Sequence, residues 1–251
     1  MKSVAPKAGL HIEIAPDYES LSRQAANLIL FEVKRRPDLL LCTSAGGTPT
    51  RTYEILGRHA GNQPAVFRKM RVLQIDEWGG LPPDSPATCE ADLRHKLLTP
   101  LRVDRNRFEA FRTDAGDPRR ECARIARWLA RHGPIDICIL GLGINGHVAM
   151  NEPGDVLTPD PHRATLTRSS RNHPMLQTLQ SKPSYGLTLG LGDIFRSRQV
   201  LLLVSGSHKR AAMRRLFTPR VTTQFPASLL WLHPNATVLC DKPATAGLAP
   251  W

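Results

Sequence analysis

Apolar residues gather in five short runs along the chain, each four to six residues long. The runs are Leu39–Cys42, Val72–Ile75, Ile135–Leu140, Val200–Val204 and Thr237–Cys240. Uninterrupted apolar runs of this length are typical of strands that are buried on both faces of a parallel sheet. The pattern therefore predicts five buried parallel strands.

Between these runs the apolar residues recur at helical spacing, which predicts four helices. They are Asp17–Val33, Pro49–Arg58, Asp117–Arg131 and Ser207–Phe217. Pro49 suits a first helical turn, and Ser207 is a good N-cap. Strands that alternate with helices indicate βαβ crossovers, and hence a three-layer α/β/α arrangement with a mostly parallel, doubly wound sheet. We expect one α/β domain over residues 1–251, with ligands bound at the carboxyl ends of the strands.

One stretch, Asn151–Ser184, carries prolines and polar residues with little periodicity. A stretch of this length without regular structure is uncommon inside a domain unless it is functional. We therefore expect it to be a long loop or lid over the active site.

The chain has a formal net charge of +12, which allows three interpretations. The charge could bind nucleic acid, steer an anionic substrate, or reflect arginines spread over solvated faces. The densest set is Arg120, Arg124, Arg127 and Arg131, whose spacing places it on one exposed helix face. Because the arginines form no single block, the sequence favours solvated faces with a phosphate site, and no nucleic-acid partner.

The five cysteines, Cys42, Cys89, Cys122, Cys138 and Cys240, form no CxxC pair, and several lie in apolar runs. This favours buried, reduced thiols in a cytoplasmic protein and argues against a zinc site. No apolar run is long enough for a membrane helix, and the N-terminus lacks the apolar core of a secretory signal. We expect no membrane partner.

Two candidate stretches follow the first pair of predicted strands. The turn Thr43–Pro49 contains Gly46, Gly47 and Thr48 and opens a helix, so its backbone N–H groups could hold a phosphate. A plain strand-to-helix turn would look the same. Asp76 and Glu77 follow the next strand, and we expect them to point in opposite directions, one into a site and one into structural hydrogen bonds. Both could instead cap a loop.

The stretch Gly141–Gly154 follows the third predicted strand and is the strongest functional signal. It offers a glycine turn, His147, and Glu152 five residues later. A histidine held by a carboxylate is a general acid/base arrangement. The glycines resemble a dinucleotide fingerprint, but their late place in the chain and the residues that follow exclude a nicotinamide site.

The last stretch, Ser205–Arg210, follows the fourth predicted strand. Lys209 lies in the first turn of a predicted helix, where a positive charge opposes the helix dipole. That local cost is consistent with an anion bound beside it. A solvated lysine is the alternative.

Together the four stretches resemble the glucosamine-6-phosphate deaminases and their relatives, the galactosamine-6-phosphate deaminases/isomerases and the 6-phosphogluconolactonases. The resemblance extends from Leu39 to Asp241 and includes Thr188–Ile194 and Pro226–His233. It implies a modified Rossmann-like α/β/α sandwich and an enzyme without metal or redox cofactor. The sequence Met150–Gly154 matches the deaminases, where the lactonases have a serine-leucine-phenylalanine run.

The resemblance also implies residue roles. Asp76 matches the carboxylate that carries a proton between C2 and C1, and His147 the ring-opening acid/base with Glu152 as its partner. Asn145 stands where some deaminases have an aspartate. The remaining matches, to phosphate-binding positions, are Gly46, Gly47, Thr48 and Lys209.

One position departs from the glucosamine enzymes, which carry a second phosphate-binding arginine near the place of Leu176. Arg171 or Lys182 are the candidate substitutes. The resemblance also implies that the set of basic residues that forms an allosteric site in some relatives is missing around Thr158 to Ala164, where the stretch itself contains Arg163.

The sequence therefore predicts conversion of a 2-amino-2-deoxyhexose 6-phosphate to a ketose 6-phosphate and ammonia. Three phrases resemble the galactosamine branch and favour galactosamine 6-phosphate, giving tagatose 6-phosphate: Asp76–Trp78, Ala87–Glu90 and Leu230–His233. The alternatives are glucosamine-6-phosphate deamination, phosphogluconolactone hydrolysis, or a sugar-phosphate-sensing or nucleic-acid-binding protein without activity. The sequence sets neither the C4 epimer nor the oligomeric state.

Overall fold

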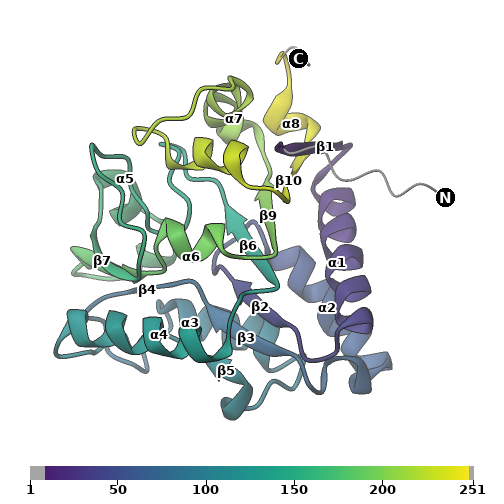
Figure 1. The fold of residues 1–251 in the computed structure, drawn as a ribbon, viewed down its shortest axis with the longest axis vertical. Helices are drawn as coiled ribbons and strands as arrows, with labels where there is room; N and C mark the ends of the chain where they lie inside the picture. The colour runs from purple at the N-terminus through teal and green to yellow at the C-terminus, as the bar shows by residue number, and fades with distance from the viewer. Residues whose placement is uncertain (1–8, 249–251) are drawn as a thin grey trace.

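The computed structural model describes residues 9–248, and within them the chain is built round a seven-stranded sheet (Figure 1). The strand order is β1-β10-β9-β6-β2-β3-β5, and all neighbouring pairs are parallel. The strands are β1 (His11–Ala15), β2 (Leu40–Thr43), β3 (Arg71–Gln74), β5 (Phe108–Glu109), β6 (Ile137–Gly141), β9 (Gln199–Val204) and β10 (Ala236–Asp241). The five predicted strands are confirmed as β2, β3, β6, β9 and β10.

Successive side chains of the central strands point to opposite faces of this sheet, and both faces are buried. In β2, Leu40 and Cys42 join one core cluster, while Leu41 joins the other. Helices α1 (Tyr18–Arg35) and α2 (Thr50–Asn62) pack on the Leu41 face, and α4 (Pro118–His132) and α7 (Arg210–Phe217) contribute to the opposite cluster. Figure 1 shows α1 and α2 together on one side of the sheet, so the predicted three layers are confirmed.

Three of the four predicted helices begin close to their expected N-termini. The Asp17 side chain caps α1 by accepting the Ser20 N–H at 2.7 Å. The predicted start at Ser207 is wrong, because Ser207–Lys209 is a 3-10 turn and α7 begins at Arg210. Gly206, with φ of +93°, takes the cap position, and its N–H donates to the Asp241 carboxylate at 3.1 Å.

A second, antiparallel sheet of three strands lies beside the first. Its order is β4 (Asp76–Trp78), β8 (Tyr185–Thr188) and β7 (His162–Thr165). The expected loop over Asn151–Ser184 therefore contains strand β7, helix α5 (Arg168–Arg171) and a 3-10 turn at Pro174–Leu176. Its strand has no apolar alternation because it is an edge strand in which only Ala164 is buried. The remaining helices are α3 (Cys89–Leu93), α6 (Leu191–Phe195) and α8 (Lys242–Thr245).

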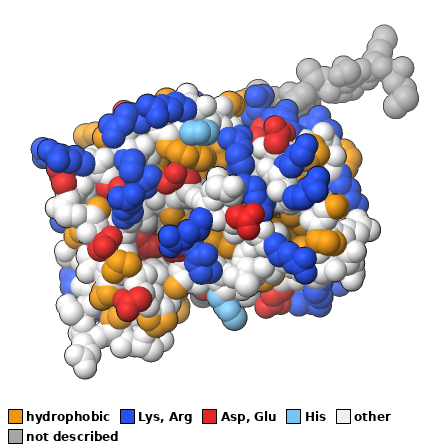
Figure 2. All heavy atoms as spheres, turned by 90° about the horizontal axis from the view of Figure 1, so that it is seen from below, with side chains coloured by type: hydrophobic (Ala, Val, Ile, Leu, Met, Phe, Trp, Pro, Cys, Tyr) orange, Lys and Arg blue, Asp and Glu red, His pale blue; other side chains and the backbone are white. Residues whose placement is uncertain are grey.

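The basic face of α4 is largely exposed, as predicted for Arg120, Arg127 and Arg131. Arg124 differs, because it is half-buried and forms ion pairs with Glu109 at 2.5 Å and Glu121 at 2.7 Å. Figure 2 shows one face of the molecule, on which Lys and Arg side chains are interspersed with acidic and apolar ones. On that face the positive charge forms no single block.

All five cysteines are free and buried, which confirms the prediction of buried thiols. Among residues 9–248, no helix is long and apolar enough to cross a membrane.

Helix α1 offers a test of this packing, because Ile29 is fully buried while Phe31 is 64% exposed on the same helix. We expect Ile29→Ala to lower the free energy of unfolding by about 2–5 kcal/mol, since it leaves a cavity under the sheet. Phe31→Ala, the matched control, should change it by about 0.5 kcal/mol or less. Urea unfolding of both variants measures the difference, and equal losses would contradict the assigned packing of α1.

Candidate active site

A cavity of about 520 Å³ lies at the carboxyl ends of β2, β3, β6 and β9. All four candidate stretches of the sequence contribute to its wall. The predicted site residues in its lining are Gly46, Gly47, Thr48, Asp76, His147 and Lys209. Asn145 and Glu152 stand behind His147 and are held in its hydrogen-bond network. Parallel strands thus bring residues more than 160 positions apart in the chain to one site.

The glycine turn between β2 and α2 forms one wall. Gly46 has φ of +105°, and its N–H donates to the Asp92 carboxylate at 2.9 Å. Lys96 pairs with the same carboxylate at 2.5 Å. Gly46 therefore does not offer its N–H to a ligand, whereas the N–H groups of Gly47 and Thr48 have no acceptor within the described residues. An anion placed here would meet two free donors.

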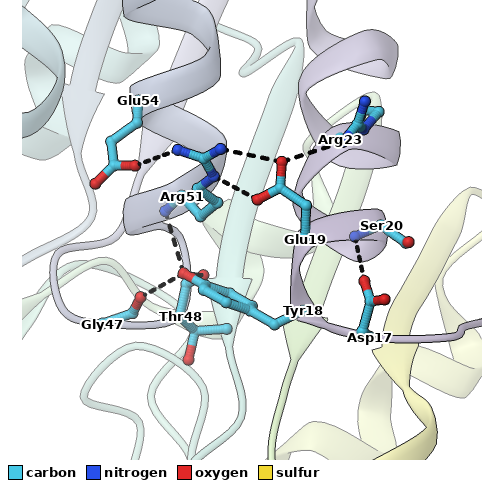
Figure 3. Close-up of polar contacts among 9 residues, drawn as sticks. All are labelled: Asp17, Tyr18, Glu19, Ser20, Arg23, Gly47, Thr48, Arg51 and Glu54. Carbon is cyan, nitrogen blue, oxygen red and sulfur yellow. Dashed lines mark hydrogen bonds and ion pairs between the residues drawn. The ribbon is translucent and has the colours of Figure 1, made fainter.

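Tyr18, from the first turn of α1, holds the same turn and also lines the cavity (Figure 3). Its hydroxyl lies 2.9 Å from the Gly47 carbonyl oxygen and 3.0 Å from that of Thr48, and it accepts the Arg51 N–H at 3.1 Å. Arg51 is tied in turn to Glu19 and Glu54. The local pattern gave no signal for Tyr18, because an aromatic residue at a helix start is ordinary.

Asp76 and Glu77 point in opposite directions, as expected from their place in a strand. Glu77 accepts four hydrogen bonds, from the Gln74 side chain and from the N–H groups of Trp78, Cys89 and Glu90, all at 2.7–2.9 Å. The Asp76 carboxylate lines the cavity and has no hydrogen-bond or ion-pair partner within residues 9–248. Burial, and then the charge of Glu77, raises the pKa of Asp76 to about 7.

His147 is held by its loop and by Glu152. Its backbone N–H donates to the Asn145 side chain at 3.1 Å, and its Nδ1 lies 3.5 Å from Glu152 Oε2. A Cβ on Gly143 would stand 2.5 Å from the ring, so this position must be glycine for the ring to lie where it does. Asn145 does not touch the ring; its amide donates to Glu152 at 2.8 Å.

Glu152 is the fixed anion of this group. Burial would raise its pKa, but the nearby charge of His147 and hydrogen bonds from Ser170 and Asn145 lower it to about 2. The carboxylate therefore stays ionised and can stabilise an imidazolium at His147.

Lys209 closes the far side of the glycine turn. Its Nζ donates to the Leu142 carbonyl oxygen at 2.6 Å, and burial lowers its pKa. Its ammonium carries further protons that the Leu142 carbonyl does not use, so it can also contact a ligand in the cavity.

Several lining residues were not foreseen, among them Trp78, His173 and His208. His173 lies in the stretch whose lack of periodicity hid its structure. The two substitutes considered for a second phosphate arginine, Arg171 and Lys182, are not in the cavity lining. Leu176 is fully buried beside Trp78 in a small apolar cluster, so its side chain does not face a ligand either.

Comparisons with known proteins show the family of the chain. Residues 16–239 match the family model described as glucosamine-6-phosphate isomerases/6-phosphogluconolactonase. The chain is 38% identical over 225 residues to AgaI of Escherichia coli (strain K12), a protein provisionally named as a deaminase. The match covers 90% of this chain and 89% of AgaI. It is 34% identical over 232 residues to the glucosamine-6-phosphate deaminase of Geobacillus sp. (strain WCH70), covering 92% of each.

Solved structures give the same result. A monomeric glucosamine-6-phosphate deaminase superposes with a TM-score of 0.90 at 32% identity, covering 94% of this chain and 99% of the other. The 6-phosphogluconolactonase of Trypanosoma brucei, at 21% identity and a TM-score of 0.75, covers 95% of this chain and 98% of its own and shares the fold. The chain thus belongs to the glucosamine-6-phosphate isomerase/6-phosphogluconolactonase family, and within it is an enzyme of the sugar-phosphate deaminase/isomerase type.

Proposed function

We propose that the enzyme converts a 2-amino-2-deoxyhexose 6-phosphate and water to the ketose 6-phosphate and ammonia. The observation that carries this proposal is Asp76, a buried carboxylate that has no partner within the described residues, lines the cavity, and has its pKa raised to about 7. A carboxylate tuned in this way is a base near neutral pH, and it can return the same proton as an acid.

The first step is the opening of the pyranose ring. Charged His147, stabilised by Glu152, gives a proton to the ring oxygen as the bond from that oxygen to C1 breaks. The neutral imidazole then takes the proton of the anomeric hydroxyl, which leaves an aldehyde at C1. Asn145 contributes by holding Glu152 and the backbone of His147, which fixes the distance between the two side chains. It is a positioning residue in this scheme.

The second step is the transfer of a proton between carbons. Asp76 removes the proton from C2 of the open-chain aldehyde, which leaves an enolamine, and returns it to C1. The product is an imine at C2 with a hydroxyl at C1. Water adds to the imine carbon, ammonia leaves, and the ketose phosphate remains. The scheme needs no metal ion and no redox cofactor, because the carbonyl at C1 and the amino group acidify C2.

The phosphate of the substrate is placed at the opposite wall. The free N–H groups of Gly47 and Thr48 and the Lys209 ammonium are its donors, and the left-handed backbone of Gly46 shapes the turn between them. The Tyr18 hydroxyl stabilises the conformation of the turn through its contacts with the carbonyl oxygens of Gly47 and Thr48.

For the sugar itself we favour galactosamine 6-phosphate, giving tagatose 6-phosphate. The support is the likeness of three sequence phrases to that branch, together with the uncharged Leu176 where glucosamine enzymes carry an arginine. Asp76 and Trp78 of the first phrase and Cys89 of the second line the cavity. Deamination of glucosamine 6-phosphate is the second candidate, and the same residues would perform it.

The pH dependence of the reaction tests the role of Asp76. Because the carboxylate must be ionised to accept the C2 proton, kcat/KM for ammonia release should rise with pH through about 7. Asp76→Asn should lower the rate by about 10²–10⁴-fold. Asp84→Asn, an exposed carboxylate in the following loop, is the matched control. A folded Asp76→Asn enzyme that keeps most of its turnover would overturn the assignment.

The Asp76 carboxylate should also lower the free energy of unfolding at neutral and higher pH. Its pKa is raised from 3.8 to about 7 on folding, so the ionised form is disfavoured in the folded protein, and stability is lost as pH rises from about 4 to 7. Asp76→Asn should therefore raise the free energy of unfolding by up to about 4 kcal/mol at pH 8, and by much less at pH 4. Denaturant titrations of wild type and variant at both pH values measure this. A gain that does not depend on pH would contradict the explanation.

Comparison of the two C4 epimers tests the substrate. A site that hydrogen-bonds the C4 hydroxyl leaves a polar group without a partner when the wrong epimer binds, at a cost of roughly 1–3 kcal/mol. We expect kcat/KM for galactosamine 6-phosphate to exceed that for glucosamine 6-phosphate by about tenfold to a hundredfold. Ammonia release from both compounds under identical conditions measures the ratio, and a preference for the gluco epimer would reverse the choice.

A further inference from the structure

The wall of the cavity contains one histidine to which the reaction scheme gives no part. The ring of His173 packs over the glycine turn, with Cε1 and Nε2 only 3.6 and 3.7 Å from the point where a Cβ on Gly46 would stand. The ring also lies beside Trp78, with centroids 5.6 Å apart. The backbone that carries it is anchored by Leu176, which is fully buried. His173 is thus held at the turn that offers the free N–H groups of Gly47 and Thr48.

The two ring nitrogens of His173 have different surroundings. Nδ1 accepts the Met175 N–H at 3.3 Å, which requires that Nδ1 carry no proton in the neutral ring. The proton of the neutral ring is therefore on Nε2, the nitrogen beside Gly46. Nε2 has no hydrogen-bond partner within residues 9–248, although His173 lines the cavity. The ring presents an unused donor at the glycine turn.

The charges that face this ring are mostly positive. His147 lies in the loop after β6, Lys209 precedes α7, and Lys96 follows α3. The acidic groups on this side are Asp92, which acts on the ring, and Asp76 in the same cavity lining. Burial first, and then these positive charges, lower the pKa of His173, and Asp92 opposes them. The free enzyme therefore favours the neutral ring at neutral pH, and an entering dianion would reverse this preference.

We propose that His173 is a ligand of the substrate's phosphate group, donating from Nε2 to a phosphate oxygen, and that it takes up a proton when the dianion enters. The inference rests on the proposed function and goes beyond it, because it makes phosphate recognition dependent on pH. Arg171, Lys182 and Leu176 are not part of the cavity lining, whereas the titratable ring of His173 is. Lys209 and the N–H groups of Gly47 and Thr48 supply the other contacts.

The sign of the pH effect follows from the direction of proton uptake. Since the bound state holds one more proton, affinity falls as pH rises between the pKa of His173 in the free enzyme and its higher pKa in the complex. Phosphate monoesters lose their second proton with a pKa of about 6. Measurements from pH 7 to 9 therefore report on the protein and not on the ligand.

The experiment uses methyl phosphate, a phosphate monoester that cannot react, as the phosphate probe, with calorimetry in buffers of different ionisation enthalpy to count protons. Wild type should take up protons on binding. His173→Gln, whose amide can still donate but cannot become charged, should bind phosphate roughly 10- to 100-fold more weakly at pH 7 and lose that uptake. His173→Arg should restore the affinity, and the pH dependence that then remains above pH 7 is that of Asp76, whose pKa is about 7. His162→Gln, outside the cavity lining, should match wild type.

A second measurement needs no variant of His173. In the wild-type protein, the NMR titration of the His173 Cε1 proton should move to higher pH when phosphate is present. Lys209→Ala should weaken phosphate binding and keep the proton uptake near neutral pH, which separates the two residues. An unmoved titration, with phosphate binding of His173→Gln within twofold of wild type, overturns the inference.

Failure of this inference can be told apart from failure of the proposed function. If neither amino-sugar phosphate releases ammonia, the proposed function fails, yet phosphate can still move the titration of His173. If ammonia is released and His173→Gln leaves KM, kcat and phosphate affinity unchanged, the role of His173 fails alone.

Discussion

The parallel pairing of the strands is the constraint on which everything else in this protein depends. Parallel neighbours must be joined by crossovers, and each crossover returns the chain to the same edge of the sheet. The carboxyl ends of β2, β3, β6 and β9 therefore meet, and each delivers one part of the cavity wall. A local sequence change in any one of these four loops alters the site without altering the sheet.

The central sheet and most of the cavity could be predicted from the sequence because both depend on local rules. Buried parallel strands appear as short apolar runs, and polar residues directly after them must lie at the carboxyl edge. The opposite orientation of Asp76 and Glu77 followed from strand geometry alone. The edge strands β1 and β5 escaped detection, since β1 has a single buried residue and β5 has two residues in all.

The second sheet could not be predicted for a different reason. Strand β7 lies at an edge, β4 begins with two carboxylates, and β4 pairs with β8 across more than a hundred residues, with Asp76 opposite Thr188. Tyr18 and His173 reach the site through such tertiary contacts. The Asp92 carboxylate accepts a hydrogen bond from the Gly46 N–H although the two residues are forty-six positions apart in the sequence. The local pattern of the turn does not indicate this contact. A role that rests on resemblance also depends on contacts that only the structure gives. Asn145 is an example, because its hydrogen-bond partners are Glu152 and the His147 backbone.

Only Ile75 separates β3 from β4, so a nearly continuous stretch of chain passes from the large sheet into the small one. Asp76, the first residue of β4, therefore lies at the point where the chain leaves the large sheet and enters the small one. Sequence changes within the family can therefore affect the two sheets separately. In the proposed scheme the residues that act at C1 and C2, Asp76 and His147, follow β3 and β6 of the large sheet, which is covered on both faces. The outer strand and turns after Asn151, with one face in solvent, are free to be rebuilt for new sugars. If the proposed roles hold, a change of substrate would require no change at Asp76 or His147.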